Sequence, residues 1–216
     1  MKSKVFIVGK HPGQVGHMFT SRGFELTDDL AAADLVQFTG GSDVNPLLYN
    51  RLKHSRTHVD ETRDKFEVVM FHNARVFNKK MAGICRGGQF LCVMAGHELW
   101  QDVDNHNRGS HQVKDKETDV VVNVTSTHHQ MMRLKKDGPE AVVIATADHL
   151  SSYKEEVDIE GYETVHRKVN DMGEDLEVVF FPGDKSLSFQ PHPEYAYNEA
   201  CTNYYFYLLE KYLGVK

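Results

Sequence analysis

The chain has 216 residues, of which 40% are hydrophobic and 26% charged, and its formal net charge is −6. This length is enough for one sizeable α/β domain, and the negative charge argues against a nucleic-acid-binding face. The apolar run after Lys4 is too short for a signal-peptide core or a membrane span. The three cysteines have no paired spacing, so we expect no disulfide scaffold and a reducing, cytoplasmic compartment.

Two apolar runs in the N-terminal part predict buried strands, at Lys4–Gly9 and Asp34–Thr39. The polar residues between them, from His11 to Asp34, predict at most a short helix and a brief strand. Apolar residues recur at helical spacing through Asp60–Asn78, whose first residue is a plausible N-cap, and lead into an apolar strand at Met81–Ile84. This strand–helix–strand order predicts a parallel sheet.

A sharp turn carrying Gly83-x-Cys85-x-Gly87 separates that strand from a predicted helix over Arg86–Ala95. The pattern is that of a nucleophile elbow in which cysteine replaces serine. A tight strand-to-helix turn strains its central residue, so its neighbours two positions away must be small. The thiol then stands at a helix N-terminus, which favours the thiolate. Taken alone, the motif also fits an inert core cysteine, and we interpret Cys92 on the same helix as a core residue rather than a resolving thiol.

The second half of the chain predicts a series of shorter strands. They are expected at Leu99–Val103, His111–Val113, Thr118–Val124, Ala141–Ala145, Leu176–Phe181 and Leu187–Gln190. The charged stretch Ser151–Asp175 predicts a surface excursion with one or two strands, and Asn198–Leu213 predicts an amphipathic helix ended by Gly214. No repeat or linker is evident, so we expect one domain over residues 1–216.

A cysteine nucleophile needs a base within hydrogen-bond reach and a group that orients the base. His192 is the base we predict, because it follows a predicted strand and is held between Pro191 and Pro193. Glu194 can accept from the other ring nitrogen, as the acid does in a catalytic triad.

An oxyanion formed by attack of Cys85 would need N–H donors. The backbone N–H of Arg86, directly after the nucleophile, is one candidate. Gly40-Gly41 follow a predicted strand, where the backbone can approach a ligand closely, and Gly41 is the second candidate. In isolation this segment also fits a plain Gly-Gly-Ser-Asp turn.

Three separated motifs together resemble the class I glutamine amidotransferase superfamily: T-G-G-S-D-V-N-P at 39–46, G-I-C-R-G-G-Q at 83–89 and H-P-E at 192–194. Within it, the chain is most similar to the γ-glutamyl-γ-aminobutyrate hydrolase-like branch of γ-glutamyl hydrolases. That branch is further supported by the pattern G-G-x-D-x-x-P-x-x-Y at 40–49, by Arg63-Asp64 with Phe66-Glu67, by L-W-Q-D at 99–102 and by S-x-H-H-Q at 126–130.

The resemblance implies an α/β, flavodoxin-like, mostly parallel sheet flanked by helices on both faces, with a small extra set of strands. It also implies a Cys85-His192-Glu194 triad that cleaves the γ-glutamyl amide bond of glutamine or a γ-glutamyl conjugate through a γ-glutamyl thioester. By position, the substrate-binding residues would be Gly40, Gln89, His128, His129 and Gln130.

The chain departs from the family where two glycines usually follow the elbow helix, because it has Gly96-His97 there. We therefore expect His97 to take a left-handed conformation. The strand before the histidine ends in Pro191 instead of an aromatic residue, and Thr125-Ser126 replaces the usual Asn-Ser. These changes leave the three residues of the expected triad in place. They do not allow the family's preference for leaving group and acyl acceptor to be carried over to this chain.

The histidines also allow a metal hypothesis, in which His106, His111, His128 and His129 cluster with Asp102 or Asp104. Their spacings match no zinc pattern, so we expect no metal and no cofactor.

Three functions stay open from the sequence: a free-standing hydrolase of small γ-glutamyl molecules, a glutaminase subunit that delivers ammonia to a separate synthetase, or a non-catalytic binding protein on the same fold. We expect no nucleic-acid or membrane partner, and the sequence leaves the oligomeric state open.

Overall fold

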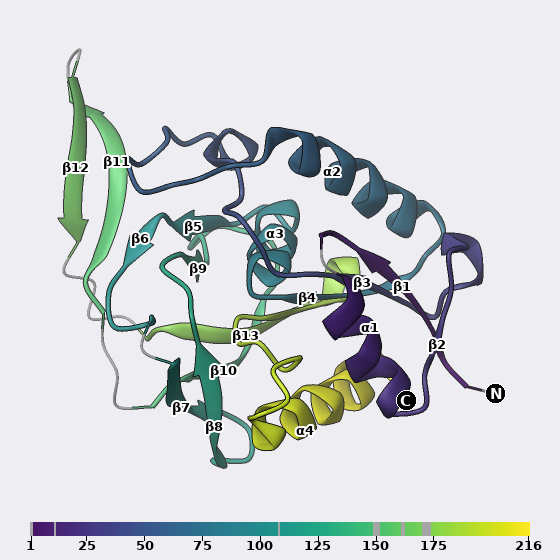
Figure 1. The fold of residues 1–216 in the computed structure, drawn as a ribbon. Coiled ribbons are helices and arrows are strands. Elements are labelled where there is room, and N and C mark those ends of the chain that lie inside the picture. Colours follow the sequence, from purple (N-terminus) through teal and green to yellow (C-terminus); the bar gives the residue numbers. More distant parts are fainter. Residues whose placement is uncertain (1, 11, 108, 149–151, 161–162, 170–173) are drawn as a thin grey trace.

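The computed structural model describes residues 2–10, 12–107, 109–148, 152–160, 163–169 and 174–216, and these form an α/β fold around a nine-stranded sheet (Figure 1). In spatial order the strands are β2 (Glu25–Leu26), β1 (Lys4–Val8), β3 (Leu35–Phe38), β4 (Lys80–Ile84), β14 (Ser186–Phe189), β13 (Leu176–Phe181), β10 (Val142–Ala147), β7 (Gly109–Asp115) and β8 (Val121–Ser126). The ladders from β2 to β14 are parallel and those from β14 to β8 are antiparallel.

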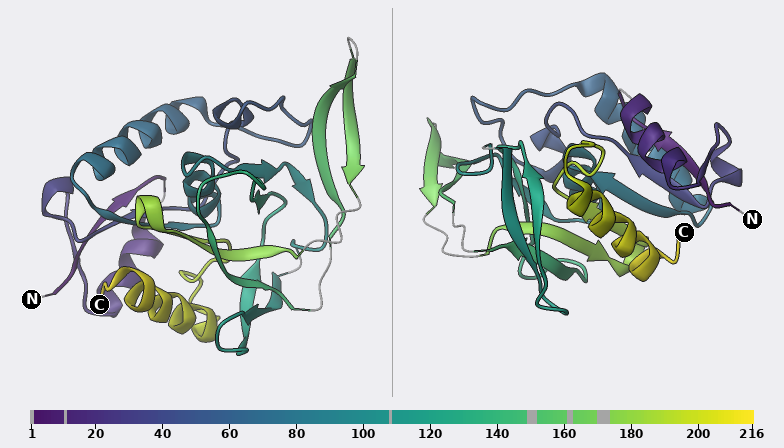
Figure 2. Two further views of the ribbon diagram at one scale, coloured as in Figure 1. Left: turned by 180° about the vertical axis from the view of Figure 1, so that it is seen from behind. Right: turned by 60° about the horizontal axis from the view of Figure 1, so that its bottom comes forward.

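Four α-helices cover the two faces of the sheet (Figures 1 and 2). They are α1 (Pro12–Ser21), α2 (Glu61–Val76), α3 (Arg86–Met94) and α4 (Glu199–Leu208), the last continued by a π-helical turn at Leu209–Leu213. Helices α2 and α3 lie on one face, and α1 and α4 on the other. The fold class predicted from the sequence is therefore confirmed, with a sheet that is mixed rather than parallel throughout.

Alternate residues of the central strands supply the two cores, as expected for a sheet buried on both faces. Leu35 and Ala82 pack toward α1 and α4, whereas Val36 and Met81 pack toward α2 and α3. Each of the two cores also contains an aromatic contact between helical elements. Phe19 packs edge-on against Phe206 on one face, and Phe71 of α2 packs against Phe90 of α3 on the other.

Two smaller sheets flank the main one. One pairs β5 (Glu98–Trp100) with β9 (Met131–Arg133), and the other orders β12 (Glu163–Val169), β11 (Lys154–Glu160) and β6 (Asp102–Val103). The β11–β12 hairpin projects away from the central sheet (Figures 1 and 2). It falls in the predicted surface excursion at 151–175, part of which lies outside the described residues.

Local signals in the sequence account for the helix ends. The Asp60 carboxylate accepts from the N–H of Arg63 and so caps α2, and Gly214 takes the left-handed conformation that ends the C-terminal helix. The sequence reading understated α1, which runs for ten residues. The expectation for His97 is wrong, because Gly96 takes the left-handed conformation instead, at φ 95°.

Candidate active site

The strand–helix corner between β4 and α3 holds Cys85 in a conformation that non-glycine residues rarely adopt, with φ 48° and ψ −111°. The flanking glycines are sterically required there. A Cβ on Gly83 would lie 2.3 Å from the backbone of Gly87, and a Cβ on Gly87 would lie 2.4 Å from the carbonyl oxygen of Phe38. The corner is therefore packed so closely that only glycine fits on either side of the cysteine.

The residues at the end of β14 bring an imidazole to the Cys85 side chain. The His192 ring and the Cys85 side chain both border the space beside Gly40, and Nδ1 of the ring lies 2.7 Å from Oε1 of Glu194. The ring stacks on Tyr195, with centroids 4.6 Å apart and planes 5° from parallel. The N–H of His192 donates to the Thr125 hydroxyl on β8 at 2.6 Å. The structure thus brings Cys85, His192 and Glu194 together, and the loop is anchored by β8, the edge strand of the same sheet.

The groups around His192 favour the protonated form of its imidazole. Burial alone would lower the pKa of the imidazole, but the charge and hydrogen bond of Cys85, together with Glu194, raise it from 6.5 to about 11. A protonated imidazole is thereby held beside the Cys85 side chain.

The Gly40-Gly41 turn after β3 faces this pair. A Cβ on Gly40 would lie 2.8 Å from Cε1 of His192 and 3.8 Å from Cβ of Cys85. The carbonyl of Gly40 accepts from Arg63 at 2.9 Å. Since C=O and N–H point in opposite directions across a trans peptide, the N–H of Gly41 points away from Arg63. The N–H of Arg86, the first residue of α3, has no intrahelical acceptor.

A buried set of ion pairs supports both the turn and the elbow. Arg63 on α2 donates to the carbonyls of Thr39 and Gly40 and to Glu67, and its guanidinium occupies the space beside Gly41, where a Cβ would lie 2.1 Å from Nη1. The Arg86 side chain pairs with Asp64 and Glu67. We call Arg63, Asp64, Glu67 and Arg86 the ion quartet. The family resemblance pointed to Arg63, Asp64 and Glu67. Nothing in the sequence indicated that they support the glycine turn and the elbow.

The predicted substrate residues lie in different surroundings. Gln89 is buried, and its amide donates to the carbonyl of Gln130 at 2.9 Å and to Oε1 of Gln190 at 3.2 Å. Nε2 of Gln190 in turn lies 3.7 Å from the sulfur of Cys85. Gln190 is a neighbour of the nucleophile that the sequence reading did not single out, although it ends the strand before the histidine loop.

Within the loop 128–130, only His129 is partly exposed; its ring lies 3.2 Å from Asp43 and 3.5 Å from Asp102. The Gln130 amide donates to the Thr57 hydroxyl at 3.2 Å. His128 is buried and faces Glu177, with its Nδ1 2.8 Å from the carbonyl of Gln130. The side chains of His128 and Gln130 thus have protein partners, and His129 is the ring with solvent access.

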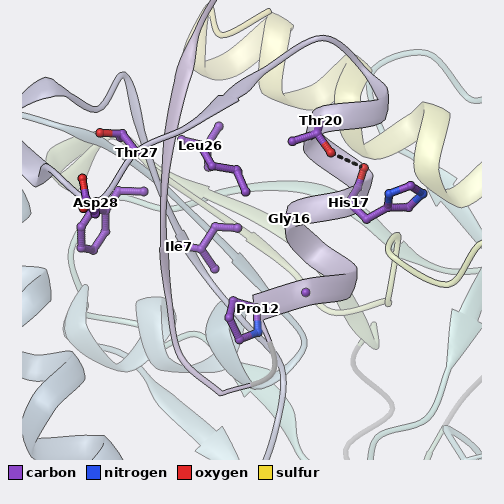
Figure 3. Close-up of a pocket in the computed structure, with 11 residues that line it drawn as sticks. Ile7, Pro12, Gly16, His17, Thr20, Leu26, Thr27 and Asp28 are labelled. Atoms are coloured by element: carbon purple, nitrogen blue, oxygen red, sulfur yellow. Dashed lines mark hydrogen bonds between the residues drawn. The ribbon is translucent and has the colours of Figure 1, made fainter.

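A large hollow elsewhere on the molecule contains none of these residues. It measures about 480 Å³ and lies between β1, α1 and residues 26–28 (Figure 3). Its walls include Ile7, Gly16 and Leu26, with His17 and Asp28 as polar groups. Cys85, His192 and Glu194 therefore lie outside this hollow.

Comparison with known proteins identifies the family. The Peptidase C26 family matches residues 20–184, more than half of the chain. The chain therefore belongs to the peptidase C26 family, which is class I glutamine amidotransferase-like. The matched range includes Cys85 and the Gly40-Gly41 turn and ends before His192 and Glu194.

Curated relatives and solved structures agree with this placement. A protein of Lactococcus lactis subsp. lactis, described provisionally as the glutamine amidotransferase-like protein YvdE, is 35% identical over 101 residues, which are 46% of this chain and 41% of that protein. Its homologue from Lactococcus lactis subsp. cremoris is 37% identical over 101 residues, 46% of this chain and 52% of that protein. The matches thus span about half or less of those relatives.

A solved glutamine amidotransferase from Thermotoga maritima superposes with a TM-score of 0.61 at 15% identity, covering 98% of this chain and 85% of that one. At this identity the structural likeness establishes the fold alone. Among the described residues, no helix combines the length and apolar character needed to cross a membrane.

The ion quartet yields a first prediction. Replacing Glu67 by Gln removes a carboxylate shared by two buried guanidinium groups, so the free energy of unfolding should fall by about 3–5 kcal/mol. Urea denaturation measures this. Glu61→Gln is the matched control, because Glu61 forms an exposed pair with Lys65 on the same helix and its loss should change stability by at most about 0.5 kcal/mol. Equal losses of stability from Glu67→Gln and Glu61→Gln would contradict the stabilising role of Glu67 in the ion quartet.

The coupling between Cys85 and His192 yields a second prediction. In Cys85→Ala the His192 pKa should fall below its wild-type value of about 11, because the Cys85 contributions are lost while burial remains. Titration followed by nuclear magnetic resonance of the imidazole nitrogens measures this.

A pKa raised in the folded state adds stability that is complete below the unfolded value and lost as pH rises through the folded one. The wild type should therefore lose this contribution between about pH 6.5 and 11, and Cys85→Ala should lose less. An identical His192 titration in both proteins would show that the two side chains are uncoupled.

Proposed function

We propose that this chain is a cysteine-dependent hydrolase that cleaves the γ-glutamyl amide bond of glutamine or of a γ-glutamyl conjugate. The observation that supports this best is the arrangement of the strained Cys85, the His192 ring and Glu194, beside a glycine turn in which the N–H of Gly41 points away from Arg63. Membership of the peptidase C26 family supports the amidotransferase-like class. Specificity for the γ-glutamyl group rests on the resemblance of the motifs.

In the first half of the reaction, the Cys85 thiolate attacks the γ-carbonyl carbon and forms a C–S bond. The negative charge that develops on the carbonyl oxygen is bound by the N–H groups of Gly41 and Arg86. The tetrahedral intermediate then collapses, the C–N bond breaks, and the leaving nitrogen takes a proton from the His192 imidazolium. The products are a γ-glutamyl thioester on Cys85 and free ammonia or an amine.

In the second half, His192 removes a proton from a water molecule that attacks the thioester. The C–S bond breaks, glutamate leaves, and the thiolate–imidazolium pair is restored. Glu194 fixes the orientation of the ring through its bond to Nδ1.

Two sets of residues would bind the glutamyl group in this proposal. Gly40 leaves room over the reactive pair, because a side chain there would collide with His192. Gln89 acts through Gln190, whose amide it holds beside the Cys85 sulfur. In the loop 128–130, His129 is the side chain placed to meet a charged end of the substrate, while His128 and Gln130 shape the loop from within.

The third prediction concerns turnover. The purified chain should release glutamate from glutamine or from a panel of γ-glutamyl amides, and Cys85→Ala should lower kcat by at least about 10³-fold, because the covalent route is lost. A coupled glutamate assay measures this. Cys92→Ser, on the same helix but in the core, tests whether any effect is specific to the elbow. Turnover that survives Cys85→Ala, or no turnover of any panel member, would contradict the proposal.

A second candidate function is that of a glutaminase that passes ammonia to a separate synthetase, since some related amidotransferases partner with synthetases. A solved structure from Thermoplasma acidophilum, described provisionally as one subunit of a GMP synthase, superposes with a TM-score of 0.64 at 14% identity, covering 99% of this chain and 94% of that one. Negligible activity of the chain alone, with strong activation by a co-purifying ATP-dependent protein, would favour this function over free-standing hydrolysis.

A further inference from the structure

Three histidines and one glutamate meet in the interior, close to Gln190, whose backbone N–H donates to the carbonyl of the glutamate, Glu177, at 2.8 Å. His106 precedes β7, His111 lies on β7, His128 lies between β8 and β9, and Glu177 lies on β13. His106 and Glu177 are fully buried, and His128 is 5% exposed. We call these four residues the histidine cluster. The catalytic proposal uses one of its side-chain contacts, that of the His128 ring with the carbonyl of Gln130.

The nitrogens converge on a single carboxylate oxygen. From Oε1 of Glu177, Nε2 of His111 lies at 2.9 Å, Nδ1 of His106 at 3.3 Å and Nε2 of His128 at 3.9 Å. In a tetrahedral zinc site with bonds of about 2.0–2.1 Å, neighbouring donor atoms are about 3.4 Å apart. The three distances to Glu177 bracket this value, and the ligand atoms of His106, His111 and Glu177 all lie within 4.8 Å of one another. A shift of the His128 side chain toward these three groups would complete a set of four.

The far nitrogens of two of the rings are held as they are in metal sites. Nε2 of His106 lies 3.0 Å from a carboxylate oxygen of Asp175, whose other oxygen lies 2.9 Å from Lys154. Nδ1 of His128 lies 2.8 Å from the carbonyl of Gln130. Metal-binding histidines usually donate their second N–H to a carboxylate or carbonyl in this way, which fixes the tautomer and directs the other nitrogen to the ion.

The groups at the centre lack hydrogen bonds of their own. Within the part of the chain that the structure describes, neither carboxylate oxygen of Glu177, nor Nδ1 of His106, nor Nε2 of His128 has a hydrogen-bond partner of good geometry. Buried polar groups are almost always satisfied, and a buried charge needs a counter-charge. A set of unsatisfied donor atoms that face one another is the arrangement expected around an ion.

The orientation of His128 leaves a place for a cation. Nδ1 of its ring lies 2.8 Å from the carbonyl of Gln130 and carries the proton that this oxygen accepts, so the lone pair of Nε2 faces the Glu177 carboxylate. A cation between these two acceptor groups would bind both of them.

We propose that His106, His111, His128 and Glu177 form a closed, four-coordinate site for a divalent transition-metal ion, with zinc as the ion of choice. Three imidazoles and one carboxylate suit zinc, and a site with four protein ligands and no open position is structural. Bound there, the ion would join β7 and β13 to the loop that carries His129. This differs from the expectation drawn from sequence spacing, because Glu177 is separated by 49 positions or more from the histidines and gave no signal.

The test is metal content, which does not depend on activity. The full chain is first dialysed, then incubated with zinc alone and freed of excess zinc. It should then retain about one ion per chain, as measured by inductively coupled plasma mass spectrometry. Loading with Co²⁺ should give the intense visible absorption of a tetrahedral complex, without the sulfur-to-metal band that a cysteine ligand would add. Because this measurement uses the unmodified chain, it tests the proposal even if a variant fails to fold.

Variants locate the ion. His111→Asn and Glu177→Gln should each lower the bound zinc at least about tenfold, and Asp175→Asn should weaken binding about 10–100-fold through the His106 ring. His72→Asn, at an exposed histidine of α2, and Cys85→Ser should leave the zinc content unchanged.

Two outcomes would overturn the site. One is a chain that retains less than about a tenth of an ion and gives no tetrahedral Co²⁺ spectrum. The other is loss of the ion in Cys85→Ser with full retention in His111→Asn, which would place the metal at the thiol instead.

Discussion

The backbone conformation of Cys85 is the constraint on which the rest of the site depends. A positive φ at a residue with a side chain costs on the order of 1–3 kcal/mol, and it persists only where the surroundings enforce it. Here Gly83 and Gly87 allow β4 and α3 to meet so closely that the chain can turn only through the cysteine. The same turn that strains the backbone projects the sulfur toward the His192 ring and places the N–H of Arg86 beside it. In the proposed mechanism, the strained backbone, the nucleophile and one oxyanion donor therefore all follow from the close packing at this corner.

The surrounding charges hold this arrangement in place from two sides. On the α2 side, Arg63 fixes the carbonyls of the glycine turn while Glu67 joins it to Arg86, so the turn and the elbow share one buried ion network. On the opposite side, Glu194 and Tyr195 orient the imidazole, and Thr125 anchors its backbone. By contrast, burial raises the pKa of the Cys201 thiol to about 12, and that of the Cys92 thiol further still. Of the three cysteines, only Cys85 is placed in a charged environment that suits nucleophilic chemistry.

The sequence carried the local features of this structure and missed those that arise from distant contacts. Apolar runs gave β13 at its observed ends, and Asp60 and Gly214 marked helix ends, because each of these signals acts within a few residues. The proximity of Cys85, His192 and Glu194 could be predicted because each of them stands in a motif whose chemistry limits the residue type. The family resemblance pointed to Arg63 and Glu67 but did not reveal what they do. Their role is to support the Gly40-Gly41 turn, and it depends on the packing of α2 over that turn. His128 is directed into the interior by Glu177, a partner far along the chain, and the short helical signal of 12–21 was masked by its two glycines.

The most direct test of the central claim is a covalent label read by peptide mass spectrometry. The chain would be treated with a glutamine analogue that carries an electrophilic carbon at the γ position, with and without competing glutamine. The account predicts one adduct per chain, on the peptide that contains Cys85, formed more slowly when glutamine is present, and absent from Cys92 and Cys201. An adduct on another residue, or no adduct at Cys85 in a chain that still releases glutamate, would contradict it.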